Sequence, residues 1–196
     1  MTSQKIAIGL VAVTLFVGSM TANADNFDVG VKAYKRGDYT TALRIYRQLA
    51  DQGNASAQTY LGFMYDTGLG VPQDYELAVR WYHKAANQGQ ALAQSNLGVM
   101  YYKGLSVTQD YAEAVRWYRK AANQGLALAQ AKLGWMYHNG FGVMQDYVQA
   151  HMWYSLTAAR GEKGASKWRD NLAKQMTPAQ IAEAQKLTRE WKPKGK

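Results

Sequence analysis

The sequence predicts an all-α fold, an α-α superhelix (solenoid) of antiparallel helix pairs. Leu61, Leu97 and Leu133 lie 36 residues apart, each at the start of the same Leu-Gly-x-Met-Tyr segment. Within each copy the apolar residues follow helical spacing, and a glycine-rich segment separates two such stretches. A fixed period of about 20–50 residues is typical of a solenoid, in which each unit buries its apolar face against its neighbours.

Residues 1–24 are set apart from the repeats. Lys5 precedes an apolar stretch over residues 6–17, and Ala22-Asn23-Ala24 has the small-x-small pattern of a cleavage site. These features predict a signal peptide cut before Asp25, and therefore an exported protein, periplasmic in a Gram-negative cell or secreted. The alternative is an uncleaved membrane anchor, but the apolar run is shorter than the roughly 18–20 residues that span a bilayer.

The next segment, 25–53, predicts a first helix pair with a short connection. Ala33-Tyr34 and Ala42 flank a Gly37-Asp38 turn, and Gly53 ends the pair in register with Gly89 of the following copy.

Residues 54–89, 90–125 and 126–161 each predict a further helix pair. In the first helix, Leu61, Met64 and Tyr65 fall at i, i+3 and i+4, on one face. A glycine follows the leucine in all three copies, although glycine inside a helix costs about 1 kcal/mol relative to alanine. We therefore expect a close approach to the second helix, with an alanine as the partner. The candidate partners are Ala78, Ala114 and Ala150.

The connection within each pair carries turn and capping residues. We expect left-handed C-caps at Gly68, Gly104 and Gly140. Ser106 replaces the second turn glycine of the other copies, so this position tolerates a side chain. Helix N-caps are expected at Asp74, Asp110 and Asp146, where catalytic carboxylates are the alternative interpretation. Asp110 with Glu113, and Asp146 with Gln149, have capping-box spacing.

The second helix of each pair has a stripe of tyrosine, alanine and valine with a tryptophan beside it. These tryptophans are Trp81, Trp117 and Trp153. Because they recur in every copy, we interpret them as packing between repeats and not as an aromatic cofactor site.

Residues 162–196 predict a helical cap and a basic tail. Thr177, Pro178 and Gln180 form an N-terminal helix signature with capping-box register. The tail, Lys192 to Lys196, is expected to be frayed.

Composition narrows the possible chemistry. The 196 residues include no cysteine, which excludes disulfides, a thiolate nucleophile and a cysteine-ligated metal. The formal net charge of +9 fits an anionic partner, but predicted export argues against nucleic acid. An anionic envelope polymer, lipid head groups or an acidic protein remain candidates, as does a solvated basic face without a specific partner.

The repeat resembles the Sel-one-like repeat (SLR) family, relatives of the tetratricopeptide repeats. The motif Ala-x-Ala-Gln-x-x-Leu-Gly-x-Met-Tyr, followed by Gly-x-Gly-Val, Asp-Tyr and Trp-Tyr, is met almost in full by residues 55–89. The likeness covers about residues 27–192, and the leading pair is similar to a tetratricopeptide hairpin. The resemblance implies a right-handed superhelix that acts as an adaptor for protein complexes. Cysteine-rich members of the family carry a disulfide in each repeat, which this chain cannot form.

The resemblance also implies that the first helix of each pair lines a concave, partner-binding groove. Residues that vary between copies on that helix are the candidates for binding a protein or peptide. They are Lys32, Lys35, Arg36, Phe63, Asp66, Val99, Tyr102, Lys103, Trp135, His138 and Asn139. No cofactor or metal site is expected. Aromatic, polar and basic groups together suit a protein interface, and a solvated groove is the alternative.

An enzyme is not expected. The three histidines are scattered, and no His-Glu-x-x-His, Gly-x-Ser-x-Gly or phosphate-binding loop is present. Some relatives have been associated with penicillin binding or hydrolysis, but this chain has neither Ser-x-x-Lys nor Lys-Thr-Gly. We predict a non-enzymatic scaffold. A basic module for peptidoglycan or polysaccharide is the alternative, and a cell-wall enzyme a third, disfavoured because Asp66 has no acidic counterpart at Tyr102 or His138.

Overall fold

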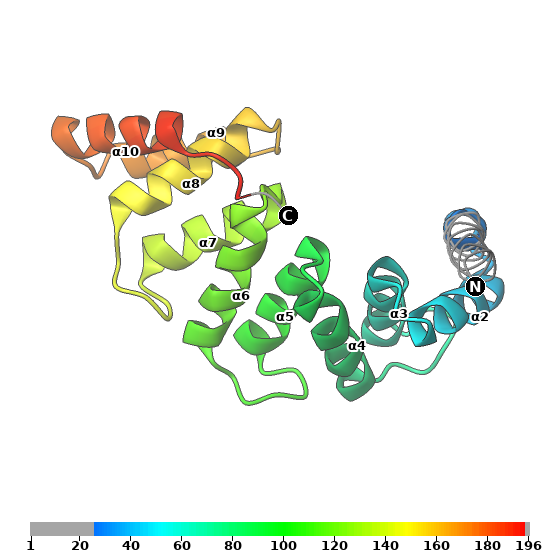
Figure 1. Ribbon diagram of the computed structural model, residues 1–196. Helices are drawn as coiled ribbons and strands as arrows, with labels where there is room; N and C mark the ends of the chain where they lie inside the picture. Colours follow the sequence, from blue (N-terminus) through cyan, green and yellow to red (C-terminus); the bar gives the residue numbers. More distant parts are fainter. Residues whose placement is uncertain (1–25, 195–196) are drawn as a thin grey trace, which may run out of the picture. The chain divides into compact units, whose positions relative to one another are not determined.

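The computed structural model describes residues 26–194, so the predicted signal segment 1–24 and the last two residues lie outside the described part. Throughout that part the regular elements are helices, which confirms the all-α prediction (Figure 1). The chain divides into two compact units, one ending at Asp74 and the other beginning at Tyr75. Among residues 26–194, no helix is long and apolar enough to cross a membrane.

The first unit contains a helix over residues 26–35, α2 (Tyr39–Asp51) and α3 (Ala55–Thr67). Asp38 and Asn54 are the N-caps of α2 and α3, because their side chains accept from the backbone N–H groups three residues on, at 3.1 and 2.9 Å. The core is aromatic: the rings of Tyr46 and Tyr60 stack with centroids 5.0 Å apart, and Phe27 lies 5.8 Å from Tyr46.

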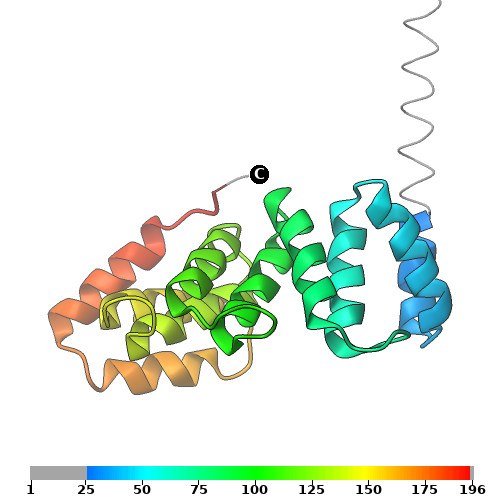
Figure 2. The same ribbon diagram turned by 90° about the horizontal axis from the view of Figure 1, so that it is seen from below.

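The second unit is a stack of helices in chain order. Its elements are α4 (Tyr75–Asn87), α5 (Ala91–Lys103), α6 (Tyr111–Asn123), α7 (Ala127–Asn139), α8 (Tyr147–Ala159), α9 (Ala165–Ala173) and α10 (Pro178–Glu190). From α4 to α9, each helix packs against the next. The last helix, α10, packs instead on α8, so α8 is covered by both α9 and α10 (Figures 1 and 2).

The expected C-caps are confirmed, and the capping boxes are half formed. Gly104 and Gly140 take left-handed φ angles of 69° and 71° after α5 and α7, as Gly68 does after α3 at 73°. Asp110 accepts from the N–H of Glu113 at 2.9 Å, as Asp146 does from Gln149 at 3.0 Å.

The reciprocal half of each box is absent in α6 and α8, contrary to what the spacing suggested. The backbone N–H of Asp110 donates to the carbonyl of Tyr101, and that of Asp146 to Tyr137, both at 3.0 Å. The side chain of Glu113 lies instead 3.3 Å from the guanidinium of Arg116.

Two of the helical glycines lie closest to tyrosines and not to the expected alanines. A Cβ on Gly98 would lie 2.5 Å from the Tyr118 ring, and one on Gly134 would lie 2.9 Å from the Tyr154 ring. Each tyrosine follows the expected alanine by one helical turn, and its ring lies against the glycine. Small residues on α5 and α7 therefore make room for large ones on α6 and α8.

The C-terminal segment seals the core of the second unit. Thr177 and Gln180 form a complete capping box at the start of α10. Trp191 lies edge-on to Trp153 at 6.2 Å, and the backbone N–H of Lys194 donates to the carbonyl of Asn123 at 2.8 Å. The basic tail is thus attached as far as Lys194, where a frayed tail had been expected.

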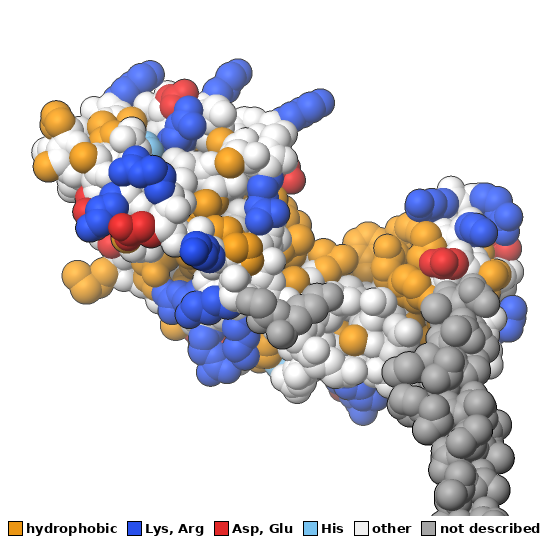
Figure 3. All heavy atoms as spheres, turned by 45° about the horizontal axis from the view of Figure 1, so that its top comes forward, with side chains coloured by type: hydrophobic (Ala, Val, Ile, Leu, Met, Phe, Trp, Pro, Cys, Tyr) orange, Lys and Arg blue, Asp and Glu red, His pale blue; other side chains and the backbone are white. Residues whose placement is uncertain are grey.

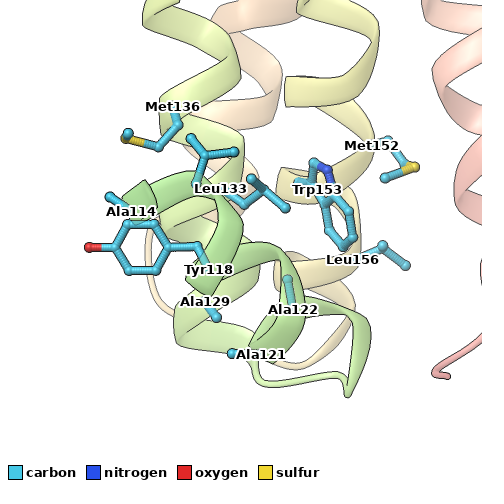
Figure 4. Packing of buried hydrophobic residues seen from close by; sticks show 11 residues of the cluster. Ala114, Tyr118, Ala121, Ala122, Ala129, Leu133, Met136, Met152, Trp153 and Leu156 are labelled. Atoms are coloured by element: carbon cyan, nitrogen blue, oxygen red, sulfur yellow. The ribbon is translucent and has the colours of Figure 1, made fainter. Parts of the chain in front are cut away.

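This packing explains why the third copy departs from the others on its second helix. Met152 and Leu156 stand where the two preceding copies have arginine and lysine. Both are buried in the cluster of Figure 4, against which Leu187 and Trp191 pack. An exposed surface in the earlier copies has become an interface for α10.

Candidate binding pocket

The first helices of the second unit border a pocket of about 590 Å³. Its lining comes from α5 to α9 and is mainly aromatic and aliphatic. The lining residues are Tyr102, Tyr118, Leu128, Ala131, Lys132, Trp135, Met136, His138, Asn139, Tyr154, Trp168 and Asn171. A volume between 300 and 1,000 Å³ is in the usual range for a ligand site.

The structure brings four of the sequence-predicted residues together in this pocket: Tyr102, Trp135, His138 and Asn139. Two others in the same unit, Val99 and Lys103, lie outside the lining. Val99 packs against the core, and Lys103 is exposed in the last turn of α5.

The remaining candidates belong to the first unit. Lys32, Lys35 and Arg36 are exposed at the end of the helix over residues 26–35. Phe63 is half-buried, with its ring 6.4 Å from that of Tyr34. Asp66 is half-buried, and its carbonyl accepts from the Gln73 amide at 2.6 Å.

The walls are apolar side chains left open to solvent. Leu128, Trp135 and Trp168 are 48%, 37% and 46% exposed, respectively. Trp135 is held by its neighbours: its ring stacks on Phe141 at 5.0 Å and meets Tyr102 edge-on at 5.6 Å. In the face shown in Figure 3, exposed hydrophobic side chains on this unit lie among projecting lysine and arginine side chains. Exposed aromatic anchors held rigid by packing are typical of binding hot spots.

Two buried tyrosines contribute polar groups to the pocket. Tyr118 and Tyr154 are 1% and 3% exposed. Figure 4 shows the Tyr118 hydroxyl pointing away from Trp153 and Leu156, the other large side chains of the core. Within residues 26–194 neither hydroxyl has a hydrogen-bond partner and neither is sealed from solvent. Burial raises the pKa of both phenols, that of Tyr154 to about 12, so both are protonated donors at neutral pH.

Sequence reasoning missed eight of the lining residues, for three different reasons. On α7, Leu128 and Lys132 precede Trp135 and Asn139 at helical spacing, so one face of that helix could have been extended from the two predicted residues. Tyr118 and Tyr154 recur at the same repeat position and were interpreted only as packing. For Trp168 and Asn171 on α9, the repeat gives no counterpart.

The pocket lacks an arrangement suited to acid–base or metal chemistry. Lys132 is the one lining side chain with a full charge, and no carboxylate lines the site. Between 26 and 194, no group of three or more His, Asp or Glu side chains could hold a metal ion. His151 lies outside the pocket, where it is 4% exposed and 3.4 Å from the Ser155 hydroxyl.

The chain is similar to two solved structures of repeat proteins. One is a Sel1 repeat protein from Oxalobacter formigenes, 42% identical, with a TM-score of 0.68 over 72% of this chain and 56% of the other. The second is a protective antigen of uropathogenic Escherichia coli strains with an SLR fold, 30% identical, with a TM-score of 0.54 over 86% and 45%. The chain thus spans about half the length of these structures. Among the curated proteins, none matches it.

The Sel1 repeat matches the chain four times, at residues 27–54, 55–90, 91–126 and 127–162. These matches cover most of the described residues and coincide with the helix pairs. Sel1 repeat proteins are helical-repeat scaffolds for protein interactions. Four consecutive matches, the helix stack and the likeness to an SLR-fold structure lead to one conclusion: the chain belongs to the Sel1 repeat family.

Proposed function

We propose that this protein is an exported, non-enzymatic adaptor that binds a segment of a partner protein in the pocket bordered by α5, α7 and α9. The observation that carries the proposal is the pocket itself, with three large apolar side chains held open to solvent in one small area. Exposed apolar clusters of this kind mark interaction sites in soluble proteins.

Export is supported by the sequence of residues 1–24, in which Lys5, an apolar stretch and a small-x-small site have the order of a signal peptide. Within residues 26–194, no carboxylate lines the pocket and no group of three or more His, Asp or Glu side chains could hold a metal ion, which supports the non-enzymatic role.

A second candidate, binding of an anionic envelope polymer, is favoured by a basic face on the second helices. The Lys84 ammonium lies 4.0 Å from the centroid of the Trp81 ring, and Lys120 lies 4.0 Å from that of Trp117. Arg116, four residues before Lys120 on α6, is also exposed. Lysines held over tryptophans form an ordered cationic surface away from the pocket.

Crosslinking capture from an envelope extract, at low and high salt, separates the two candidates. The parent chain is compared with Leu128→Ala/Trp135→Ala, which opens two walls of the pocket. Leu92→Ala is the matched control, because Leu92 occupies the place of Leu128 in the preceding repeat, is 40% exposed and lies outside the lining.

We expect one protein to be captured at both salt concentrations by the parent and by the control, and lost with the double variant. Apolar contacts persist at high salt, whereas attraction between exposed charges is screened. If capture is lost at high salt and is the same for the parent chain and the double variant, the result would contradict the adaptor function and support polymer binding.

A further inference from the structure

The polar groups of the pocket are mostly hydrogen-bond donors. Lys132 supplies an ammonium, and Tyr118 and Tyr154 supply hydroxyls. Asn171 also lines the pocket, and its amide oxygen already accepts from the Lys174 ammonium at 3.2 Å, so its N–H groups are the part of the amide still available to a ligand. Asn139 reverses the pattern, because its amide N–H donates to the Trp135 carbonyl at 2.8 Å and leaves an oxygen as acceptor.

The phenolic hydroxyls are the best-placed donors. Their rings are fixed by packing over Gly98 and Gly134, so the positions of the two oxygens are set by the helix pairs and not by free rotation of a long side chain. Neither hydroxyl has a hydrogen-bond partner in the described part of the chain, so donating to a ligand breaks no bond within the protein. A ligand that covers a hydroxyl without accepting its hydrogen bond leaves that donor unsatisfied, at a cost in binding free energy. The pocket should therefore bind more tightly a ligand that presents carbonyl or carboxylate oxygens to these hydroxyls.

The charge at the pocket also favours a ligand with carboxylate oxygens. Lys132 is exposed at the pocket, and no Asp or Glu lines the site within the described residues. A cationic ligand would meet a like charge with no compensating carboxylate, and an anionic ligand would meet an unopposed ammonium.

Building on the function proposed above, we propose that the pocket recognises a peptide segment in which a large aromatic side chain is adjacent to an acidic residue. The aromatic side chain packs against Trp135 and Trp168, and the acidic residue pairs with Lys132. Backbone carbonyls of the segment accept from the hydroxyls of Tyr118 and Tyr154. Aromatic burial supplies the affinity, and the charge supplies the selection.

Four blocked synthetic hexapeptides test this inference with the full chain. They share a Gly/Ser frame and differ at two central positions, which are Phe–Asp, Phe–Asn, Phe–Lys or Ala–Asp. Binding is followed through the indole N–H NMR signals of the protein, which Trp135→Phe and Trp168→Phe assign. Because the peptides contain no tryptophan and no free termini, each signal reports the protein alone.

We expect the Phe–Asp peptide to move the Trp135 and Trp168 signals with the lowest dissociation constant. Phe–Asn should bind about twofold to fivefold more weakly, the range for one exposed ion pair. Phe–Lys should bind more weakly still, and Ala–Asp at least about tenfold more weakly, because the aromatic anchor is lost.

Lys132→Met should abolish the difference between Phe–Asp and Phe–Asn and keep that between Phe and Ala. Lys103→Met, a lysine outside the lining, is the control and should change neither. Equal binding of the three Phe peptides would overturn the acidic preference and leave the adaptor function standing. If no peptide moves the two signals, this inference is wrong, and the capture experiment alone decides the adaptor function.

Discussion

At the scale of single residues, Ser106 occupies a backbone conformation that favours glycine. Its φ is 53°, and it is the one residue other than glycine with positive φ in the described chain. The equivalent residues are Gly70 and Gly142, at 75° and 68°. Tolerance of a side chain at this turn, inferred from the sequence, is therefore correct but has an energetic cost.

Ser106→Gly should stabilise the second unit by about 0.5–1 kcal/mol, because relief of the left-handed strain exceeds the added entropy of the unfolded chain. Thermal unfolding should show a rise of about 1–4 °C. Ser106→Ala keeps the strained φ and serves as the control. An equal rise for both variants would mean that the side chain, and not the backbone, is responsible.

Gly98→Ala should destabilise the protein, although alanine usually stabilises a helix. An alanine in a helix is normally more favourable than a glycine by about 1 kcal/mol of helix stability. Here the new Cβ would meet the Tyr118 ring, and overpacking costs about 1–3 kcal/mol. Denaturant unfolding should show net destabilisation in the parent chain and a neutral or favourable effect in a Tyr118→Ala background. Additive effects in this double-mutant cycle would refute the contact.

Acidification should destabilise the protein through His151. Burial, followed by the nearby Arg169, lowers the pKa of this imidazole in the folded state below its ordinary value. The unfolded chain then binds a proton that the folded chain does not, so stability falls as the pH drops below about 6.5, the ordinary histidine pKa.

His151→Val, the residue found at this position in the two preceding copies, should reduce the loss of stability between pH 7.5 and pH 5.5. Unfolding midpoints at both pH values provide the measurement. His83 is also half-buried with a lowered pKa, so part of the loss should remain. An unchanged pH dependence in the variant would rule out His151 as its source.

At the scale of elements, α10 determines what the surface of α8 can be. Leu156→Lys restores the residue found in the earlier copies, but places an ammonium beneath α10. We expect a loss of about 2 kcal/mol or more and faster proteolysis after Met176, because a buried charge has no partner there. The matched exchange, Lys120→Leu at an exposed position of α6, should change stability by no more than about 0.5 kcal/mol. Similar effects of both exchanges would contradict the role of α10.

The helices could be predicted from the sequence because their signals are local. The spacing of Leu61, Met64 and Tyr65, the glycine caps and the Thr177 capping box each depend on residues a few positions apart. The packing of α10 on α8 depends on contacts between distant residues, for which Met152 and Leu156 were an unexplained departure from the repeat.

The pocket was predictable only in part, for a related reason. Variation between copies identified Trp135 and His138, since residues free of the packing stripe can vary. It could not identify Tyr118, which stands at a packing position that recurs in the repeats and also lines the pocket. Periodicity assigns a whole residue to core or surface, but a tyrosine can serve both.

At the scale of the molecule, stability in the second unit should follow position in the stack. The middle helices α6, α7 and α8 are covered by neighbours on two or more sides, and α9 packs mainly on α8. Amide hydrogen exchange should be slowest in α6 to α8 and fastest in α9. Equal protection of α9 and α7 would indicate that α9 is held by something beyond its contact with α8.

The covering of α8 by α10 also limits how such a chain can grow. A duplicated copy of residues 91–126 carries a charged outer face and can be inserted anywhere before the last repeat. A duplicated copy of residues 127–162 would expose its own equivalents of Met152 and Leu156, because the chain has no second copy of α10 to cover them. Duplication of repeats within this protein is therefore restricted by position. Repeats can be added inside the array, whereas the final repeat and its C-terminal helix must be inherited together.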